Sequence, residues 1–326
     1  MRSPRAIWLW FVAGFSLATL LLLIPIHVWT TRLPDHSRNP GFRRGWYEFV
    51  RTTPPRQAGE KLVLIISNSQ GYGREMNESE TYAMRLQALL RAQGQPARVV
   101  NWSIPGGQFF DFLMLAAAAR DLQPDVLVLP LASVVFSLPD RPHEGPDSWT
   151  SDLHHLLSVG AIRRRLASAD RQSRLTVSLW GDILIGRAWP IWRWRQWPTA
   201  WLARHDQLAP LLPDDVGASW YGPPPRRFLQ PPPERAMVLQ SNQAERFLDL
   251  AQPVAPRIIL VNQPRHSTWL AQTDRVWAPL TELAQARGIE VIQLQHTVPD
   301  DSYLTATHLD RAGHDIFARR LLEHLP

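Results

Sequence analysis

The sequence predicts an α/β protein in which a parallel sheet lies between two layers of helices, behind one N-terminal transmembrane helix. From residue 61 to the end, short apolar runs that suit buried strands alternate with amphipathic helical patterns. Strands separated by helices of this length imply right-handed crossovers and a doubly wound sheet. A long uncharged run lies near the amino terminus. Together these observations predict a three-layer α/β/α domain with a membrane anchor.

The N-terminal run covers residues 7–29, and no Asp, Glu, Lys or Arg interrupts it between Arg5 and Arg32. About 20 such residues cross the hydrocarbon core of a bilayer as a helix. Trp8, Trp10 and Trp29 lie near the ends of the run, where indole rings favour the membrane interface. We therefore expect residues 1–30 to form a short cytoplasmic stub and a transmembrane anchor.

Arg2 and Arg5 favour an amino terminus on the cytoplasmic side of the membrane, although Arg32, Arg38, Arg43 and Arg44 follow the run. The expected location is the inner membrane, crossed once, with the C-terminal domain in the periplasm. A cleaved signal peptide is the alternative, but the run is long for one and no clear small-x-small cleavage site follows it. Residues 31–60 are polar and contain prolines, which is typical of a juxtamembrane linker. Residues 61–326 then form the folded domain.

The domain contains strand patterns at residues 62–67, 97–102, 125–131, 257–262 and 289–294. Residues 175–180 are a further, short candidate. Helical patterns occupy residues 78–92, 108–122, 151–169 and 274–287, the last of them stopped by Gly288. A final amphipathic helix starts near Asp310, whose carboxylate suits an N-cap.

Residues 181–239 fit a regular α/β domain least well. Arginines and tryptophans alternate there before two proline runs, the tryptophans being Trp189, Trp192, Trp194, Trp197 and Trp201. Three interpretations stay open: an amphipathic element on the membrane surface, a platform that stacks on sugar rings, or a helical insertion that packs on the core or on a partner subunit.

Composition limits the chemistry that this chain can perform. There is no cysteine, so neither disulfides nor thiolate metal sites can form. The spacing of His308 and His314 does not match a helical metal site, so we assign no metal and expect no cofactor. The formal net charge is +6, but the arginines are scattered and no nucleic-acid-binding pattern accompanies them.

Ser69 follows the first predicted strand, and His308 lies just before the last predicted helix. In open parallel sheets, ligands bind beyond the carboxyl ends of the strands, so the predicted fold brings both residues to one edge. A serine hydroxyl acts as a nucleophile only with a base within hydrogen-bond reach. The other interpretation of the segment around Ser69 is a polar turn without chemistry.

This order of residues resembles that of the SGNH (GDSL-like) hydrolases, from about residue 60 to the end of the chain. Ser69 matches the family nucleophile, with Asn68 before it as a substrate-binding candidate. Gly106 and Gly107 look like the second block, where a glycine N–H helps to form the oxyanion hole. His308 looks like the general base. The resemblance also implies a flavodoxin-like sheet.

The chain departs from the family at two positions. Val134 stands where the third block usually has an asparagine, so Ser133 or Asn262 is expected to supply a donor instead. Thr305 stands where an aspartate usually orients the histidine, and Asp301 is the expected substitute. These departures affect the oxyanion hole and the partner of the histidine.

The resemblance and the anchor together predict a membrane-anchored, extracytoplasmic esterase or O-acyltransferase. Such a protein would act on acyl groups, acetyl above all, of a cell-envelope polysaccharide through an acyl-Ser69 intermediate. The resemblance further implies a membrane-bound acyl-transfer protein as partner. The alternative is a non-catalytic protein of the same fold that binds a glycan or a membrane partner, because two of the family's site residues are replaced.

Overall fold

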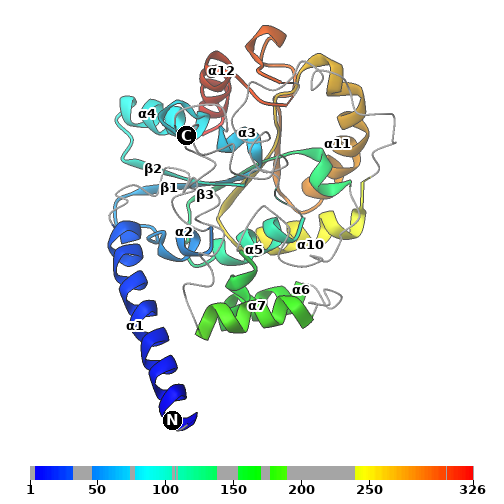
Figure 1. Ribbon diagram of the computed structural model, residues 1–326. Coiled ribbons are helices and arrows are strands. Elements are labelled where there is room, and N and C mark those ends of the chain that lie inside the picture. The colour runs from blue at the N-terminus through cyan, green and yellow to red at the C-terminus, as the bar shows by residue number, and fades with distance from the viewer. Residues whose placement is uncertain are drawn as a thin grey trace.

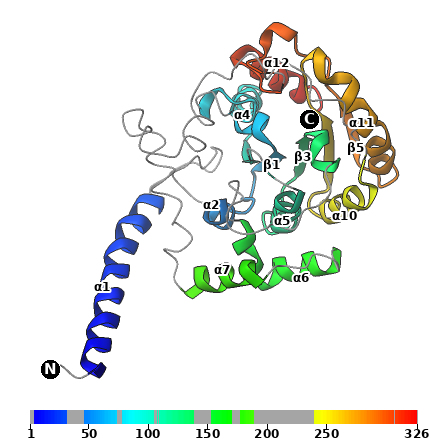
Figure 2. The ribbon, with the colours of Figure 1, turned by 45° about the vertical axis from the view of Figure 1, so that its right-hand side comes forward.

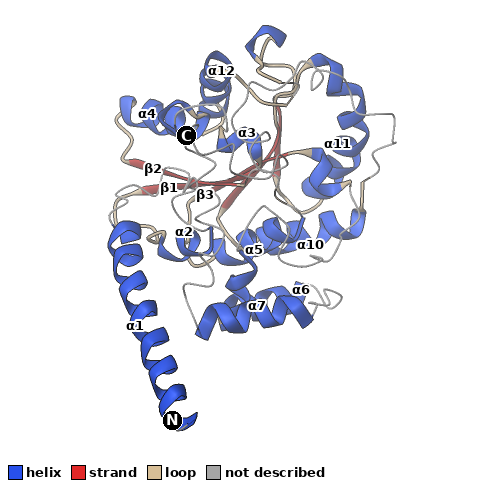
Figure 3. Cartoon of the chain, viewed as in Figure 1, coloured by secondary structure: helices blue, strands red, loops and turns tan. Residues whose placement is uncertain are grey.

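A computed structural model of the protein describes residues 4–31, 46–73, 78–104, 107, 109–137, 153–169, 177–188, 239–305 and 307–325. In that part of the chain, five parallel strands form one sheet: β1 (Lys61–Ser67), β2 (Ala97–Ser103), β3 (Val126–Leu131), β4 (Arg257–Asn262) and β5 (Glu290–Gln293). Their order across the sheet is β2-β1-β3-β4-β5. Figure 3 shows β2, β1 and β3 side by side in red. The parallel sheet predicted from the sequence is therefore confirmed.

The central strands are apolar on both faces. Along β1, Leu62, Leu64 and Ile66 face one core, Val63 and Ile65 face the other, and all of them are fully buried. A strand that is buried on both faces has a continuous apolar run instead of an alternating one. This is why β1 can be recognised from its sequence.

Helices cover both faces of the sheet, which confirms the predicted three layers (Figures 1 and 2). One face carries α4 (Tyr82–Ala92) and α12 (Arg311–Leu322). The other carries α2 (Trp46–Thr52), α5 (Phe109–Ala119), α10 (Ser241–Ala251) and α11 (Leu270–Gln285). Asp310 caps α12 as expected, because its carboxylate accepts a hydrogen bond from Gly313 N at 2.8 Å.

Further helices cover the outer side of α5. The 3-10 helix η4 (Leu153–Ser158) and α6 (Gly160–Ala169) pack against α5, and α7 (Val177–Ala188) packs against η4 (Figure 1). As a result, α5 is buried on every side and no residue of it is more than 7% exposed. This arrangement explains why all residues of α5 except Asp111 are apolar.

Two local predictions differ from the structure. The predicted strand at residues 175–180 is wrong, because Val177–Ala188 is a helix; a short apolar run suits a strand and a buried helix equally well. The helices predicted at residues 78–92 and 151–169 are each interrupted. They begin as the 3-10 helices η2 (Glu78–Glu80) and η4, ahead of α4 and α6.

Part of the stretch that was expected to be a linker, residues 31–60, packs in the core. Trp46, Tyr47, Phe49 and Val50 of α2 are all buried. The ring of Trp46 lies 6.2 Å from that of Tyr72, just beyond β1. The packed part of the domain therefore begins at or before Trp46.

The N-terminal helix α1 spans Pro4–Thr31 and covers the run expected to be an anchor. Large apolar side chains are exposed along it, including Trp8 (67%), Trp10 (71%) and Leu21 (61%). Of the helices in the described part of the chain, none is both long enough and apolar enough to cross a membrane. Most of the insertion expected at residues 181–239 lies outside the described residues, and residues 181–188 belong to α7.

Candidate active site

Ser69 lies directly beyond the carboxyl end of β1, where the order of the strands reverses. From β1 the chain passes to β2 on one side, and then to β3 on the other. In open parallel sheets the ligand crevice forms at such a switch point. The chain turns there at Asn68, whose Oδ1 accepts from Gln70 N at 3.0 Å and caps the short helix α3 (Ser69–Tyr72). Ser69 is half-buried in this turn.

Two glycines allow the Ser69 turn (residues 67–73) to form. Gly73 ends α3 with φ +65° and donates to Ser69 O at 3.2 Å. A Cβ on Gly71 would lie 2.6 Å from the Tyr82 hydroxyl and 2.7 Å from Ser67 Cβ. Asn101 of β2 also donates to Gly71 O at 3.0 Å. These contacts fix the turn against the sheet.

A narrow loop presents His308 between the 3-10 helix η9 (Asp300–Ser302) and α12. We call it the His308 loop (residues 303–309). Leu304 N donates to His308 O at 2.8 Å across the loop. The buried hydroxyl Oγ1 of Thr305 accepts from His308 N at 3.0 Å and from Thr307 N at 3.3 Å. Thr305 thus holds the backbone of His308, at the position where the sequence resemblance implied an aspartate.

The structure brings Ser69 and His308 together. Ser69 Oγ lies 2.9 Å from His308 Nε2, although the two residues are 239 positions apart. Gln70 helps to hold this geometry, because its Nε2 donates to Pro264 O at 2.9 Å and to Thr307 O at 3.1 Å. Gln70, directly after Ser69, is therefore hydrogen-bonded to Thr307, directly before His308. The separation is within the reach that a general base needs.

Asp301 does not occupy the expected position beside His308. In the described part of the chain it forms no hydrogen bond or ion pair with that histidine; it is exposed and accepts from Ser302 Oγ at 3.4 Å. The physical reason is that η9 turns the Asp301 side chain outward. Of the two residues, it is Thr305 that contacts His308, through the backbone.

The expected oxyanion donors are also arranged differently. Gly107 N donates to Ile104 O at 3.3 Å, so this N–H belongs to a turn. Asn262 is 1% exposed, and its Nδ2 donates to Gln293 Oε1 at 2.9 Å. Gly106 and the side chain of Ser133 lie outside the described residues. The Asn68 amide caps α3, which makes it a positioning residue for Ser69.

A buried polar cluster that the sequence did not single out lies behind Ser69. Its members are Asn68, Gln70, Gln263 and Arg265, which are 9%, 1%, 1% and 5% exposed. In the amide orientation that satisfies its neighbours, Gln263 Oε1 accepts from Asn68 Nδ2 at 3.1 Å and from Arg265 Nη2 at 2.8 Å. Gln263 Nε2 donates to Gln70 Oε1 at 3.2 Å. The signal in the sequence was a polar segment directly after β4, at the same edge as Ser69.

A second link fixes η9, directly before the His308 loop, to the segment after β4. The Asp300 carboxylate accepts from Ser267 Oγ at 2.5 Å and from Ser267 N at 2.9 Å, and it lies 3.8 Å from His266 Nε2. The hydrogen bonds from the Ser267 hydroxyl and N–H lower the pKa of Asp300. Gln70 thus holds the His308 loop itself, and Asp300 holds η9, which leads directly into that loop.

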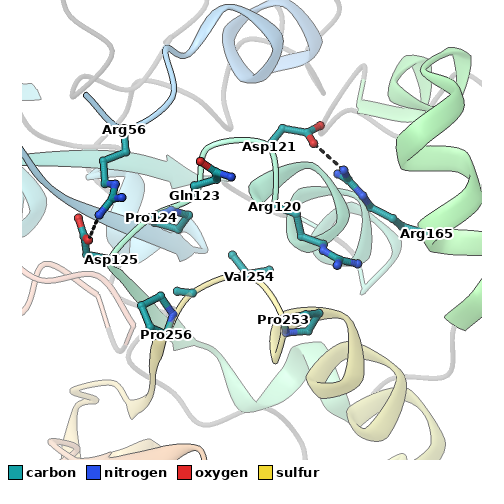
Figure 4. Close-up of a pocket in the computed structure, with 11 residues that line it drawn as sticks. Arg56, Arg120, Asp121, Gln123, Pro124, Asp125, Arg165, Pro253, Val254 and Pro256 are labelled. Atoms are coloured by element: carbon teal, nitrogen blue, oxygen red, sulfur yellow. Dashed lines mark hydrogen bonds and ion pairs between the residues drawn. The ribbon is translucent and has the colours of Figure 1, made fainter. Parts of the chain in front are cut away.

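A pocket of about 820 Å³ lies at the opposite edge of the sheet, where the strands begin (Figure 4). Ion pairs line it: Arg56 contacts Asp125 at 2.5 Å, and Arg165 contacts Asp121 at 2.6 Å. Asp125 also accepts from Leu62 N at 2.8 Å, at the start of β1. The lining contains neither Ser69 nor His308, so this pocket is separate from the candidate active site.

Comparisons with known proteins do not assign the chain to a family. No protein-family model matches it, and no curated protein does. Among solved structures, it is similar to a lipase/acylhydrolase from Enterococcus faecalis (12% identity, TM-score 0.42, covering 81% of this chain and 95% of the other). It is also similar to a carbohydrate acetylesterase family member from Sinorhizobium meliloti (14%, 0.37, covering 81% and 97%). At this level of likeness, function must be argued from the chain's own residues.

Proposed function

We propose that this protein is a serine esterase or O-acyltransferase of the SGNH type, with Ser69 as nucleophile and His308 as base and acid. The observation that carries the proposal is the 2.9 Å separation between Ser69 Oγ and His308 Nε2, at the switch point of the sheet. A serine–histidine contact at this place is the minimum that nucleophilic acyl chemistry requires. The residues that hold both partners add the rigidity that such chemistry needs.

The reaction would proceed in two acyl transfers. Ser69 Oγ adds to the acyl carbonyl carbon while His308 Nε2 takes the hydroxyl proton, and the carbonyl electron pair moves onto oxygen. The tetrahedral intermediate then expels the alkoxide, which receives that proton from His308. Water or a sugar hydroxyl next attacks acyl-Ser69 while His308 takes its proton. The intermediate releases the acid or the transferred ester, and the departing Ser69 Oγ takes that proton from His308. Ser69 N–H, in the first turn of α3, is the backbone donor that the geometry offers to the oxyanion.

The finer part of the proposal concerns substrate and location. We infer that the acyl groups, acetyl above all, belong to a cell-envelope polysaccharide, and that a membrane-bound acyl-transfer protein is a partner. The uncharged run at residues 7–29 and the exposed apolar side chains of α1 support an anchor in the inner membrane. The domain would then face the periplasm. A reporter fused after residue 326 that is active only outside the cytoplasm would agree with this orientation, and a reporter active only inside would contradict it.

A fluorophosphonate probe tests the chemistry most directly, because it labels only activated serines. The full chain should be labelled in its membrane fraction. Ser69→Ala and His308→Ala should each reduce the labelling rate by about 1000-fold or more. Ser241→Ala, at the exposed start of α10, is the matched control and should label at the rate of the unchanged protein.

Two outcomes would overturn the assignment. Labelling that survives Ser69→Ala would place the nucleophile elsewhere. Folded wild-type protein that the probe does not label would favour the non-catalytic alternative, in which the fold binds a glycan or a membrane partner. Equilibrium binding of acetylated envelope polysaccharide to the unlabelled protein would then distinguish those two binding roles.

A further inference from the structure

Arg265 is the most unusual charged group near the candidate active site. It follows β4 and is 5% exposed, and in the described part of the chain no carboxylate lies within ion-pair distance of it. Its Nη2 donates to Gln263 Oε1 at 2.8 Å, while its buried Nε has no hydrogen-bond partner. A buried guanidinium without a carboxylate is costly, because it has lost water and gained no counter-charge.

The groups around Arg265 do not neutralise it. Burial lowers the pKa of Arg265 to about 10, so the guanidinium remains charged at neutral pH. Tyr303 is the ionisable group that interacts with it electrostatically, and burial raises the pKa of Tyr303, which keeps the phenol neutral. The charge of the Arg265 guanidinium is therefore buried at this edge of the sheet without a carboxylate beside it.

Arg265 lies between the two elements that carry the reacting side chains. On one side, Gln263 links its guanidinium to Asn68, the residue before Ser69. On the other side, Tyr303 begins the His308 loop and forms a bridge with Leu309. The amide of Gln70 joins the two sides, because it bonds both Pro264 O and Thr307 O. The charged guanidinium of Arg265 is thus linked to both elements that position Ser69 and His308.

We propose that the buried positive charge of Arg265 stabilises the negative charge that develops on the substrate oxygen when Ser69 attacks. The inference rests on the proposed function. It accounts for the resting cost of the buried charge, because that cost is recovered when an anion forms nearby in a medium of low dielectric. It also accounts for a site in which Val134 replaces the family asparagine and Gly107 N–H bonds Ile104 O.

The test separates charge from packing with three substitutions in the full-length protein. Arg265→Lys keeps a positive charge, Arg265→Gln keeps a polar partner for Gln263, and Arg265→Met keeps only bulk. The acylation rate constant is taken from the nitrophenolate burst with p-nitrophenyl acetate, a neutral ester. We expect Gln and Met to lower it by about 10- to 100-fold, and Lys to retain most of it. The ester concentration for half-maximal rate should change by less than about threefold, since the charge acts on the transition state.

Arg98→Met is the matched control at the other edge of the sheet. Arg98 is also largely buried, but it is paired with Glu60 at 2.8 Å. Its loss should lower the melting temperature and leave the acylation rate of the folded protein unchanged. If Arg265→Met does not fold, the Lys and Gln variants decide the question, because both keep a donor for Gln263.

Each result has one meaning. An acylation rate of Arg265→Gln equal to that of the wild type overturns the inference. So does a Lys variant as slow as the Met variant, since charge would then not be the property that matters. A change only in the ester concentration for half-maximal rate would make Arg265 a substrate-binding residue instead. If wild-type protein shows neither burst nor fluorophosphonate labelling, the proposed function fails and this inference falls with it.

Discussion

At the amino edge of the sheet arginines are paired with carboxylates, whereas at the carboxyl edge Arg265 is buried without one. Arg98 contacts Glu60 at 2.8 Å, and Arg257 contacts Glu290 at 2.8 Å, both where strands begin. At the other edge, buried amides and the guanidinium of Arg265, which has no carboxylate partner, form the polar cluster that contacts Asn68 and Gln70 on either side of Ser69. Both edges belong to the same strands, so the difference is not imposed by the apolar core.

The comparison shows which edge of the sheet adds to the free energy of unfolding and which edge lowers it. Ion pairs that are partly open to solvent contribute about 0–1 kcal/mol each, so the amino edge is mildly favourable. A buried, unpaired charge costs several kcal/mol, and the carboxyl edge carries that cost. Proteins break local rules of this kind mainly at functional sites. The contrast supports the carboxyl edge as the reactive one, and the following changes test it.

Gly71→Ala should have the largest effect. Its new Cβ would meet Ser103 Oγ, the Tyr82 hydroxyl and Ser67 Cβ, all of them in the wall behind Ser69. We expect the free energy of unfolding to fall by about 3 kcal/mol, as for an overpacked core. Any protein that folds should label slowly with fluorophosphonate, because the turn must shift. Urea denaturation followed by circular dichroism measures the first effect.

Gly181→Ala is the control for this substitution. Gly181 lies in α7, and no heavy atom would come within 4 Å of its new Cβ. Alanine there should raise the free energy of unfolding by up to about 1 kcal/mol, the difference in helix propensity. If both variants were equally stable, the tight packing of the Ser69 turn would be refuted.

Much of the fold could be predicted, because it depends on runs of apolar residues. β1 and β4 are continuous and buried on both faces, so each could be read without knowing its neighbours. The structure of the run at residues 175–180 could not be predicted, because a run of this length suits both a helix and a strand. Its residues from Val177 onward form part of helix α7.

The candidate site divides in the same way. Ser69 and His308 could be expected to meet, because both follow from chain order and from the edge of a parallel sheet. Gln263 and Arg265 could not be singled out, because polar residues after a strand normally face solvent. Only the packing of the Ser69 turn and the His308 loop buries them. The side chain of Asp301 accepts a hydrogen bond from Ser302 Oγ and is exposed, because nearness in sequence does not fix the direction of a side chain.

Thr305→Val should have an intermediate effect on the carboxyl edge. Valine has the shape of threonine but cannot accept the hydrogen bonds from Thr307 N and His308 N. Leaving these donors unpaired should cost about 1–3 kcal/mol of unfolding free energy. Displacement of the imidazole should slow acylation by about 10-fold or more. Urea denaturation and the nitrophenolate burst measure the two effects.

Thr305→Ser is the matched control, because it keeps the hydroxyl and loses only a methyl group. It should acylate at close to the wild-type rate. A serine variant as slow as the valine variant would mean that the methyl group, and not the hydroxyl, holds the His308 loop.

Asp300→Asn should have the smallest effect, and that effect should depend on pH. The hydrogen bonds from Ser267 lower the pKa of the Asp300 carboxyl below its value in the unfolded chain, so ionised Asp300 stabilises the folded state. This contribution is fully present above the unfolded pKa, near 4, and is lost as the pH falls through the folded pKa. Since the side chain is 48% exposed, we expect the melting temperature to fall by only about 1–2 °C at pH 6, and by less at pH 3.5.

Asp301→Asn, one residue along the same turn, is the control and should change the melting temperature less at pH 6. Differential scanning calorimetry of the three proteins at both pH values measures this. A deficit for Asp300→Asn that grew on acidification would contradict the assigned role of the carboxylate in holding the His308 loop.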